Sequence, residues 1–144
     1  MSLLEPAELK RLAQLRSENG VIVSLYLNVD GRKYSHKQNY EAELKILIKQ
    51  ALKQWTENGQ LSKEWQTALK DDLNAIYQYV TGEFQRQGYK GLVIFKSGPE
   101  KIWQVYPLAV TVPTRLIISQ EAYTKILSTV LDEHKRFCTV VVDR

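Results

Sequence analysis

The sequence predicts a domain of the α/β class, with a mixed sheet of about four or five strands and helices on both faces. Two observations support this class. Apolar, β-branched runs alternate with longer segments that have helical periodicity, in the order α-β-α-α-β-β-β-α-β. The length of 144 residues, of which 44% are apolar and 25% are charged, is typical of one globular domain.

The first two elements are a short helix and a central strand. Residues 7–17 have apolar side chains on one face, and the Asn-Gly pair that follows is expected to end this helix. Residues 21–29 read Val-Ile-Val-Ser-Leu-Tyr-Leu-Asn-Val, so almost every position is apolar. A strand of this kind has both faces covered and lies in the centre of its sheet. The turn residues Asp30 and Gly31 end it.

A long helical hairpin is predicted next. A polar and basic loop over residues 31–38 leads into a helix over 39–56, which has an apolar stripe that includes Trp55. A second helix is expected over 63–86, with Ser62 as its N-cap. The short loop between the two helices indicates that they are antiparallel neighbours.

The second half of the chain is richer in strands. Strands are predicted over residues 91–96, 102–108 and 116–118, and the second of these alternates apolar and polar side chains. A helix is predicted over 120–134 with Ser119 as its cap, followed by a last strand over 137–142.

The same chain predicts a cytoplasmic location. The single cysteine, Cys138, excludes an internal disulfide and a cysteine-rich metal site. No apolar run approaches the roughly 20 residues of a membrane span, and the first residues do not resemble a signal peptide. Because an apolar strand reaches almost to the last residue, we expect residues 1–144 to be a single domain, the N-terminal domain of a longer protein.

The positive charge is concentrated in one stretch. The net charge is +4, and residues 31–63 hold seven basic against three acidic side chains, which accounts for the whole excess. Lysines recur every fourth residue on the helix, where Glu41 and Lys45 are expected to pair. This face is either merely solvated or contacts phosphates, with Tyr34 and His36 placed to stack on bases. The candidate nucleic-acid-binding residues are Arg32, Lys33, Tyr34, Lys37, Lys45, Lys49, Lys53 and Lys63.

Most catalytic signatures are missing from the sequence, among them Gly-x-Gly-x-x-Gly, the Walker loop, His-Glu-x-x-His and Gly-x-Ser-x-Gly, and no cofactor is predicted. His36 is interpreted as a solvated loop residue and His134 as a cation in the last turn of a helix. Cys138 is expected to be buried in a strand, where thiols are usually inert. The adjacent pair Asp71 and Asp72 diverges around its helix, so a solvated helix face is favoured over a carboxylate pair. Trp55 and Trp65, which flank the hairpin tip, are interpreted as core residues rather than as a stacking platform.

The chain resembles the N-terminal domain of archaeal and eukaryotic class 1 peptide-chain release factors. The resemblance lies in the order of elements and in the apolar pattern over nearly the whole chain. It is carried by Glu8–Leu12, Asn19–Leu27, Gly91–Phe95, Pro113–Leu116 and Cys138–Asp143. The chain looks closest to the bacterial relatives of these factors, which are mostly uncharacterised. The resemblance implies a module of a translation factor whose partners are the ribosome or tRNA.

The motifs of this family are not present where they belong. Its codon-reading Asn-Ile-Lys-Ser motif would lie at the hairpin tip, which here includes Asn58, Gly59, Gln60 and Ser62. Its second motif, Tyr-x-Cys-x-x-x-Phe, would fall on Leu116, Ile118 and Ala122. The Gly-Gly-Gln motif that releases the peptide belongs to the next domain of the family. The resemblance therefore implies no reading of stop codons and no catalysis by this chain.

Three functions follow from these observations. The leading hypothesis is a non-catalytic module that docks on ribosomal RNA or tRNA through the loop over residues 32–37 and the lysine face. The first alternative is a protein-interaction or structural domain whose basic face is merely solvated. The second is a small hydrolase-like enzyme that uses Asp30, Asp143 or His36 in a cleft.

Overall fold

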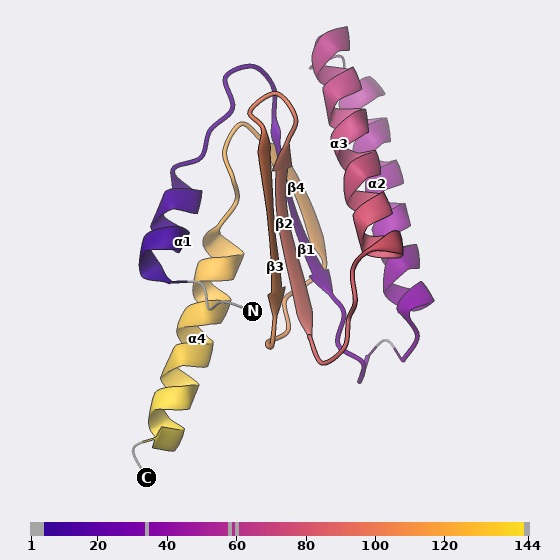
Figure 1. The fold of residues 1–144 in the computed structure, drawn as a ribbon. Coiled ribbons are helices and arrows are strands. Elements are labelled where there is room, and N and C mark those ends of the chain that lie inside the picture. Colours follow the sequence, from indigo (N-terminus) through magenta and orange to yellow (C-terminus); the bar gives the residue numbers. More distant parts are fainter. Residues whose placement is uncertain (1–4, 34, 58, 60, 143–144) are drawn as a thin grey trace.

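The sheet lies between two helical layers, as Figure 1 shows. The computed structural model describes residues 5–33, 35–57, 59 and 61–142, with side chains up to residue 133. The elements are α1 (Pro6–Ala13), β1 (Ile22–Asn28), α2 (Lys37–Glu57), α3 (Lys63–Gly82), β2 (Gly91–Ser97), β3 (Ile102–Leu108), β4 (Arg115–Ser119) and α4 (Lys125–Val142). The predicted combination of helices on both faces of a sheet is therefore confirmed, and so is the order of the first eight elements.

Strand β1 lies inside the sheet, as its apolar sequence predicts. The strand order is β3-β2-β1-β4, and all three pairings are antiparallel. Leu25 in β1 is opposite Ile94 in β2 and Leu116 in β4. Six of the seven residues of β1 are buried, because neighbouring strands cover both of its edges and helices cover both of its faces.

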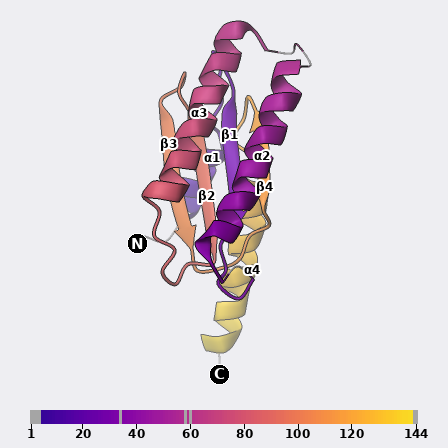
Figure 2. The same cartoon turned by 90° about the vertical axis from the view of Figure 1, so that its right-hand side faces the viewer.

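The alternation of side chains along β1 divides the core into two layers. Val23, Leu25 and Leu27 face the helical hairpin and pack in one apolar cluster with residues of α2 and α3. Ile22 and Tyr26 point to the opposite face, where α1 and the first turns of α4 pack. Figure 2 shows α2 and α3 lying side by side across one face of the sheet.

The helical hairpin forms as the sequence predicts. Ser62 is the N-cap of α3, because its hydroxyl oxygen accepts a hydrogen bond from the Trp65 backbone N–H at 3.2 Å. Trp55 and Trp65 are partly buried against the core, so their interpretation as core residues is confirmed. Helix α3 ends at Gly82, four residues before the predicted end, and a loop then runs to β2.

The last predicted strand, over residues 137–142, is wrong. These residues continue α4, and Cys138 is therefore in a helix. The strand was predicted from their β-branched side chains. Valine and threonine destabilise a helix by only a few tenths of a kcal/mol each, so this preference is easily outweighed. His134 lies inside α4 rather than in a last turn, so that prediction is wrong as well.

Helix α4 also begins later than predicted, because the segment before it is bound to other elements. The Ala122 backbone N–H donates to the Leu15 carbonyl at 3.2 Å. The next residue, Tyr123, donates its N–H to the Ser24 hydroxyl at 2.9 Å. Residues 120–122 thus run beside the segment that follows α1, which also explains why α1 ends at Ala13 and not at residue 17.

The prediction of a solvated face for Asp72 is wrong. Its exposed fraction is 3%, and both of its carboxylate oxygens accept a hydrogen bond from the Gly98 backbone N–H at 3.0 Å. The Lys96 ammonium lies 3.9 Å from the same carboxylate. Burial raises the pKa of Asp72, while the hydrogen bond and the lysine act in the opposite direction. The side chain therefore ties α3 to the turn after β2, and only Asp71 is exposed.

Candidate nucleic-acid interface

The lysine face, by which we mean Lys45, Lys49 and Lys53 of α2, is exposed to solvent along its whole length. One step of four residues advances about 6 Å along a helix and turns about 40° around it. None of the ion pairs among the described residues involves these lysines. Glu41 and Glu57 flank the three lysines at the same spacing of four residues, but neither forms an ion pair with them in the described structure.

The expected pairing between Glu41 and Lys45 is wrong. Glu41 instead lies 3.7 Å from the ammonium of Lys37, one turn toward the start of the helix. Lys37 also donates a hydrogen bond to the Thr81 carbonyl at 3.3 Å, near the end of α3. A cation is favourable there because carbonyl oxygens gather at the C-terminal end of a helix. Lys37 thus holds the two helices together, which leaves Lys45 to the solvent.

The turn after β1 is built around Asp30. Its carboxylate accepts the Arg32 backbone N–H at 3.0 Å and also binds the Arg32 guanidinium, at 3.1 Å and 2.8 Å. These bonds from Arg32 lower the pKa of Asp30 to about 2. The side chain of Asp30 is 8% exposed, whereas that of Arg32 is 76% exposed. The turn is thus fixed from inside and presents a guanidinium to solvent.

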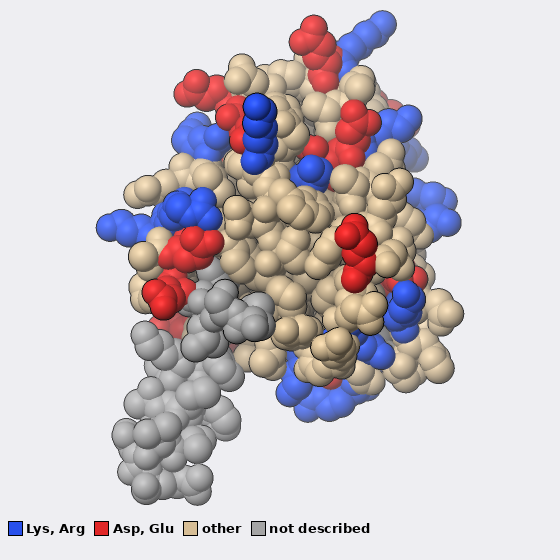
Figure 3. Space-filling view, viewed as in Figure 1, with Lys and Arg blue, Asp and Glu red and all other residues tan. Residues whose placement is uncertain are grey.

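A second loop, residues 83–90, meets this turn at the same end of the sheet. The two loops are neighbours because β1 and β2 are antiparallel, with Asn28 opposite Gly91. The Arg86 guanidinium donates to the Val29 carbonyl at 3.4 Å and to the Ser35 carbonyl at 3.2 Å. It also lies 5.6 Å from the ring centroid of Tyr40. Figure 3 shows basic side chains gathered at this lower end of the molecule.

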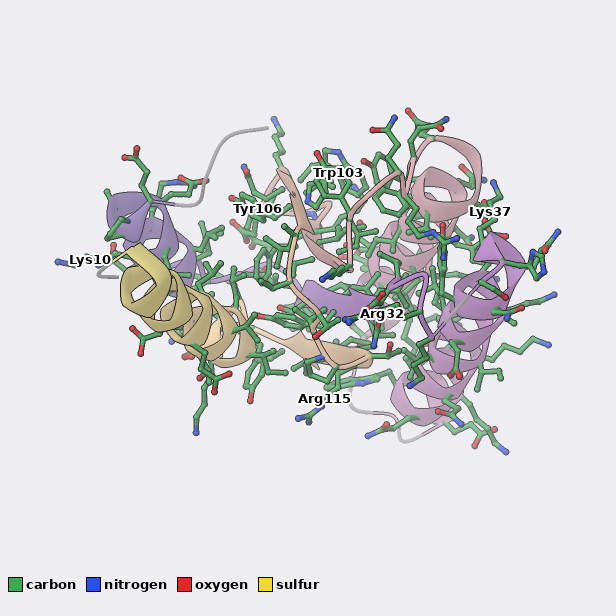
Figure 4. All side chains as sticks on the ribbon, turned by 90° about the horizontal axis from the view of Figure 1, so that it is seen from below. Lys10, Arg32, Lys37, Trp103, Tyr106 and Arg115 are labelled. Atoms are coloured by element: carbon green, nitrogen blue, oxygen red, sulfur yellow. The ribbon has the colours of Figure 1, made fainter. Side chains whose placement is uncertain are left out.

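The predicted site residues divide into two groups. Arg32 and Lys33 lie at the end of the sheet, and Figure 4 shows Arg32 at this end, seen from below. The lysine face runs away from it toward the hairpin tip, and Lys53 is about 24 Å along the helix axis from Lys37. Lys63 is exposed at the first position of α3, beyond the tip.

Three of the predicted site residues lie outside the described residues. They are Tyr34, in the loop before α2, and Asn58 and Gln60, at the hairpin tip. Gly59 is exposed and has a φ of +64°, which suits a glycine in a tight turn. Ser62 uses its hydroxyl as the helix cap, so its observed role is structural.

Arg86 and Lys90 were not among the predicted site residues. Both flank Gly88 in a segment that the sequence indicates only as a return to strand. The sequence signal that could have indicated them is a pair of cationic side chains, four residues apart, on either side of a turn. Nothing local in the sequence places them beside Arg32, because that proximity depends on strand pairing.

Of the three residues proposed for an enzyme, the structure describes Asp30 and His36. His36 is exposed in the loop before α2. A carboxylate with a pKa of about 2, like that of Asp30, is too weak a base for proton abstraction near neutral pH. Asp143 lies outside the described residues. Among the residues that the structure describes, no three His, Cys, Asp or Glu side chains could hold a metal ion together.

Comparisons with known proteins bear on the fold and not on the function. Neither a protein-family model nor a curated protein matches the sequence. One solved structure, described as an archaeal protein, is similar to it with a TM-score of 0.59 and 20% sequence identity. The match covers 84% of this chain and 33% of the other, so the chain spans about a third of the length of that protein. None of the helices in the described part of the chain is long and apolar enough to cross a membrane.

Proposed function

We propose that this chain is a non-catalytic RNA-docking module of a bacterial release-factor-like protein. It docks on ribosomal RNA or tRNA through the lysine face of α2 and the basic turn at Arg32. The observation that carries the proposal is the lysine face, three exposed cations with no acidic partner among the described residues. The sequence at the hairpin tip lacks the codon-reading motif, so the proposed docking does not include recognition of a stop codon.

The physical reason concerns the cost of keeping like charges together. Neighbouring lysines at a spacing of four residues repel one another by a few tenths of a kcal/mol per pair, which lowers the stability of the helix. A polyanion reverses this effect, because each lysine that contacts a phosphate releases a condensed counterion. The face is also long, so several phosphates of one strand can be contacted at once.

The test measures how the affinity for RNA depends on salt. An unmodified tRNA transcript is titrated by fluorescence anisotropy between about 50 and 300 mM KCl. In the triple variant Lys45→Gln, Lys49→Gln and Lys53→Gln, the slope of log affinity against log salt should decrease in magnitude by about 2 to 3. Helix α2 itself should remain, since the replaced side chains are exposed and glutamine is a good helix former.

A control with the same net charge separates a specific face from general attraction. Lys10, Lys101 and Lys125 are exposed on other elements and are replaced together by glutamine. This variant should keep most of the wild-type slope. Equal losses in the two triple variants, or no detectable binding at 50 mM KCl, would exclude docking through the lysine face.

The edge of the sheet at β3 favours the alternative of a protein-interaction domain. Trp103 on this strand is 41% exposed, and Figure 3 shows few charges over this side of the molecule. Such a domain would bind a protein through β3 and be indifferent to the lysine face. Trp103→Lys should then abolish association with the partner, whereas under the proposed function it leaves the affinity for tRNA unchanged or slightly higher.

A further inference from the structure

A pocket of about 330 Å³ opens between the turn after β1 and the loop before β2. We call it the basic pocket, and its lining consists of Asp30, Gly31, Arg32 and residues 86–90. Its volume is at the lower end of the range for small-molecule sites and exceeds what a single water or ion needs. The pocket lies at the end of the sheet, where the two loops meet.

The charges around the basic pocket are unbalanced. Arg32, Arg86 and Lys90 supply three cations, while Asp30 is the single acidic side chain in the lining. The Asp30 carboxylate accepts hydrogen bonds from the guanidinium of Arg32 at 3.1 Å and 2.8 Å. The lining therefore carries an excess of two positive charges, which attracts an anion to this open pocket.

Backbone hydrogen bonds hold the loop before β2 against its neighbours. The Val29 N–H donates to the Lys90 carbonyl at 3.0 Å, and the Lys90 N–H donates to the Leu108 carbonyl at 2.9 Å. The Tyr89 N–H closes a turn on the Arg86 carbonyl at 2.8 Å. Because the Arg86 guanidinium is itself anchored on two backbone carbonyls, its position is set before any ligand arrives.

Two glycines leave the space between the loops open. A Cβ atom placed on Gly31 would lie 3.9 Å from the Arg86 Cζ atom, which shows that the guanidinium lies over this glycine. A Cβ atom placed on Gly88 would have no neighbour within 4 Å. Both glycines line the pocket, and a side chain at Gly88 would enter open space.

We propose that the basic pocket binds one phosphate group of the docked RNA. Guanidinium groups present several donors in one plane, which suits the oxygens of a phosphate, and Lys90 adds a point charge. Tyr89, which lines the pocket and is half-buried, provides an apolar wall for the attached nucleoside. Since α2 begins at Lys37, close to the Ser35 carbonyl that Arg86 binds, a strand lying on α2 can reach this pocket.

This inference rests on the proposed function, and the experiment tests the two separately. The variant Gly88→Glu adds a carboxylate at the rim of the pocket and removes no native contact. The control is Gln14→Glu, which changes the net charge equally at an exposed position after α1, on the other side of the sheet. Both variants are the full chain, and their thermal unfolding is compared with wild type.

The first measurement uses inorganic phosphate as the probe, at constant ionic strength held with KCl. Amide resonances of residues 30–32 and 86–90 should shift together, with saturation, in the wild type and in Gln14→Glu. In Gly88→Glu the affinity for phosphate should fall about tenfold, the effect of one like charge close to the ligand. Shifts that spread over all basic segments, or that persist equally in Gly88→Glu, would overturn the proposal.

The second measurement uses the tRNA transcript and its salt dependence. Gly88→Glu should decrease the magnitude of the slope by about 1, as the loss of one phosphate contact does, and Gln14→Glu should not. Saturable phosphate binding without tRNA binding would retain a phosphate pocket and reject the RNA-docking function. Binding of tRNA that is equal in the two variants would retain the function and reject the pocket as a contact.

Discussion

The buried carboxylate of Asp72 gives the sharpest prediction about stability. Asp72→Ala removes both acceptors of the Gly98 N–H and the partner of Lys96. A charge-assisted hydrogen bond of this kind contributes about 1.5–3 kcal/mol. The pair with Lys96 adds little, because 3.9 Å is long for an ion pair. Removing a desolvated carboxylate offsets part of the loss, so we expect the free energy of unfolding to fall by about 2 kcal/mol.

A second substitution, Gly98→Ala, tests the geometry of the contact. A Cβ atom on Gly98 would lie 3.0 Å from the Asp72 Oδ1 atom, so the carboxylate would have to move by a few tenths of an ångström. In the wild type this substitution should therefore lower stability. In the Asp72→Ala background the obstacle is gone, and Gly98→Ala should raise stability by about 0.4–1 kcal/mol because it restricts the unfolded chain. The two substitutions should thus be non-additive by about 1 kcal/mol or more.

The assay is urea unfolding at pH 7, followed by tryptophan fluorescence. With a slope near 2 kcal/mol per molar urea, Asp72→Ala should lower the midpoint by about 1 M. The matched control is Asp71→Ala on the adjacent, exposed residue, which should change stability by less than about 0.5 kcal/mol. If Asp72→Ala and Asp71→Ala have equal midpoints, or if Gly98→Ala has the same effect in both backgrounds, the proposed link between α3 and the turn is refuted.

Three further predictions concern pH and the second core layer. Burial raises the pKa of Asp72, so the wild type should lose stability relative to Asp72→Asn as the pH rises from about 3.8 through the folded-state pKa. The pKa of Asp30 is lowered to about 2, so its contribution should be present above pH 3.8 and be lost relative to Asp30→Asn as the pH falls toward 2. Urea midpoints between pH 2 and 7 measure both differences, and slopes of equal sign would contradict these assignments. Tyr26→Phe removes the hydrogen bond to the Tyr123 carbonyl and should lower Tm by about 3–6 °C in calorimetry; a change below about 1 °C would show that this bond contributes nothing.

The elements that could be predicted are those whose signal is local. Strand β1 is recognisable because seven successive positions must be compatible with burial on both faces. The hairpin is recognisable from two apolar stripes of helical period and from Ser62, whose side chain needs only the next turn to act as a cap. In both cases the decisive contacts lie within a few residues along the chain or follow from one periodicity.

The errors occurred where contacts distant in sequence decide between alternatives of similar energy. Residues 137–142 prefer a strand by small intrinsic differences, which the continuation of α4 outweighs. Asp72 lies three residues after Leu69 and four before Ile76, so its position on the buried side of α3 follows from helical spacing. Because Asp72 is charged, the sequence favoured an exposed position. The hydrogen bond that permits its burial comes from the turn at Gly98, which is distant in sequence.

In the candidate site, too, only the part with a local sequence signal could be predicted. The lysine face follows from a spacing of four residues within one helix. The basic pocket joins Arg32 to Arg86 and Lys90, which are more than fifty residues away in sequence. Their proximity depends on the register that puts Asn28 opposite Gly91, and no periodicity within either segment encodes that register.

The strand order has a consequence for how the chain folds during its synthesis. Strand β1 is complete at residue 28, but its second neighbour, β4, ends at residue 119. At ribosomal speeds this interval lasts about 5–20 s, and throughout it one edge of a highly apolar strand has no partner. The hairpin of α2 and α3 is synthesised within this interval and can cover one face of β1 before β2 arrives. The arrival of β4 then closes the exposed edge, so the vulnerable period for aggregation ends with the synthesis of its five residues.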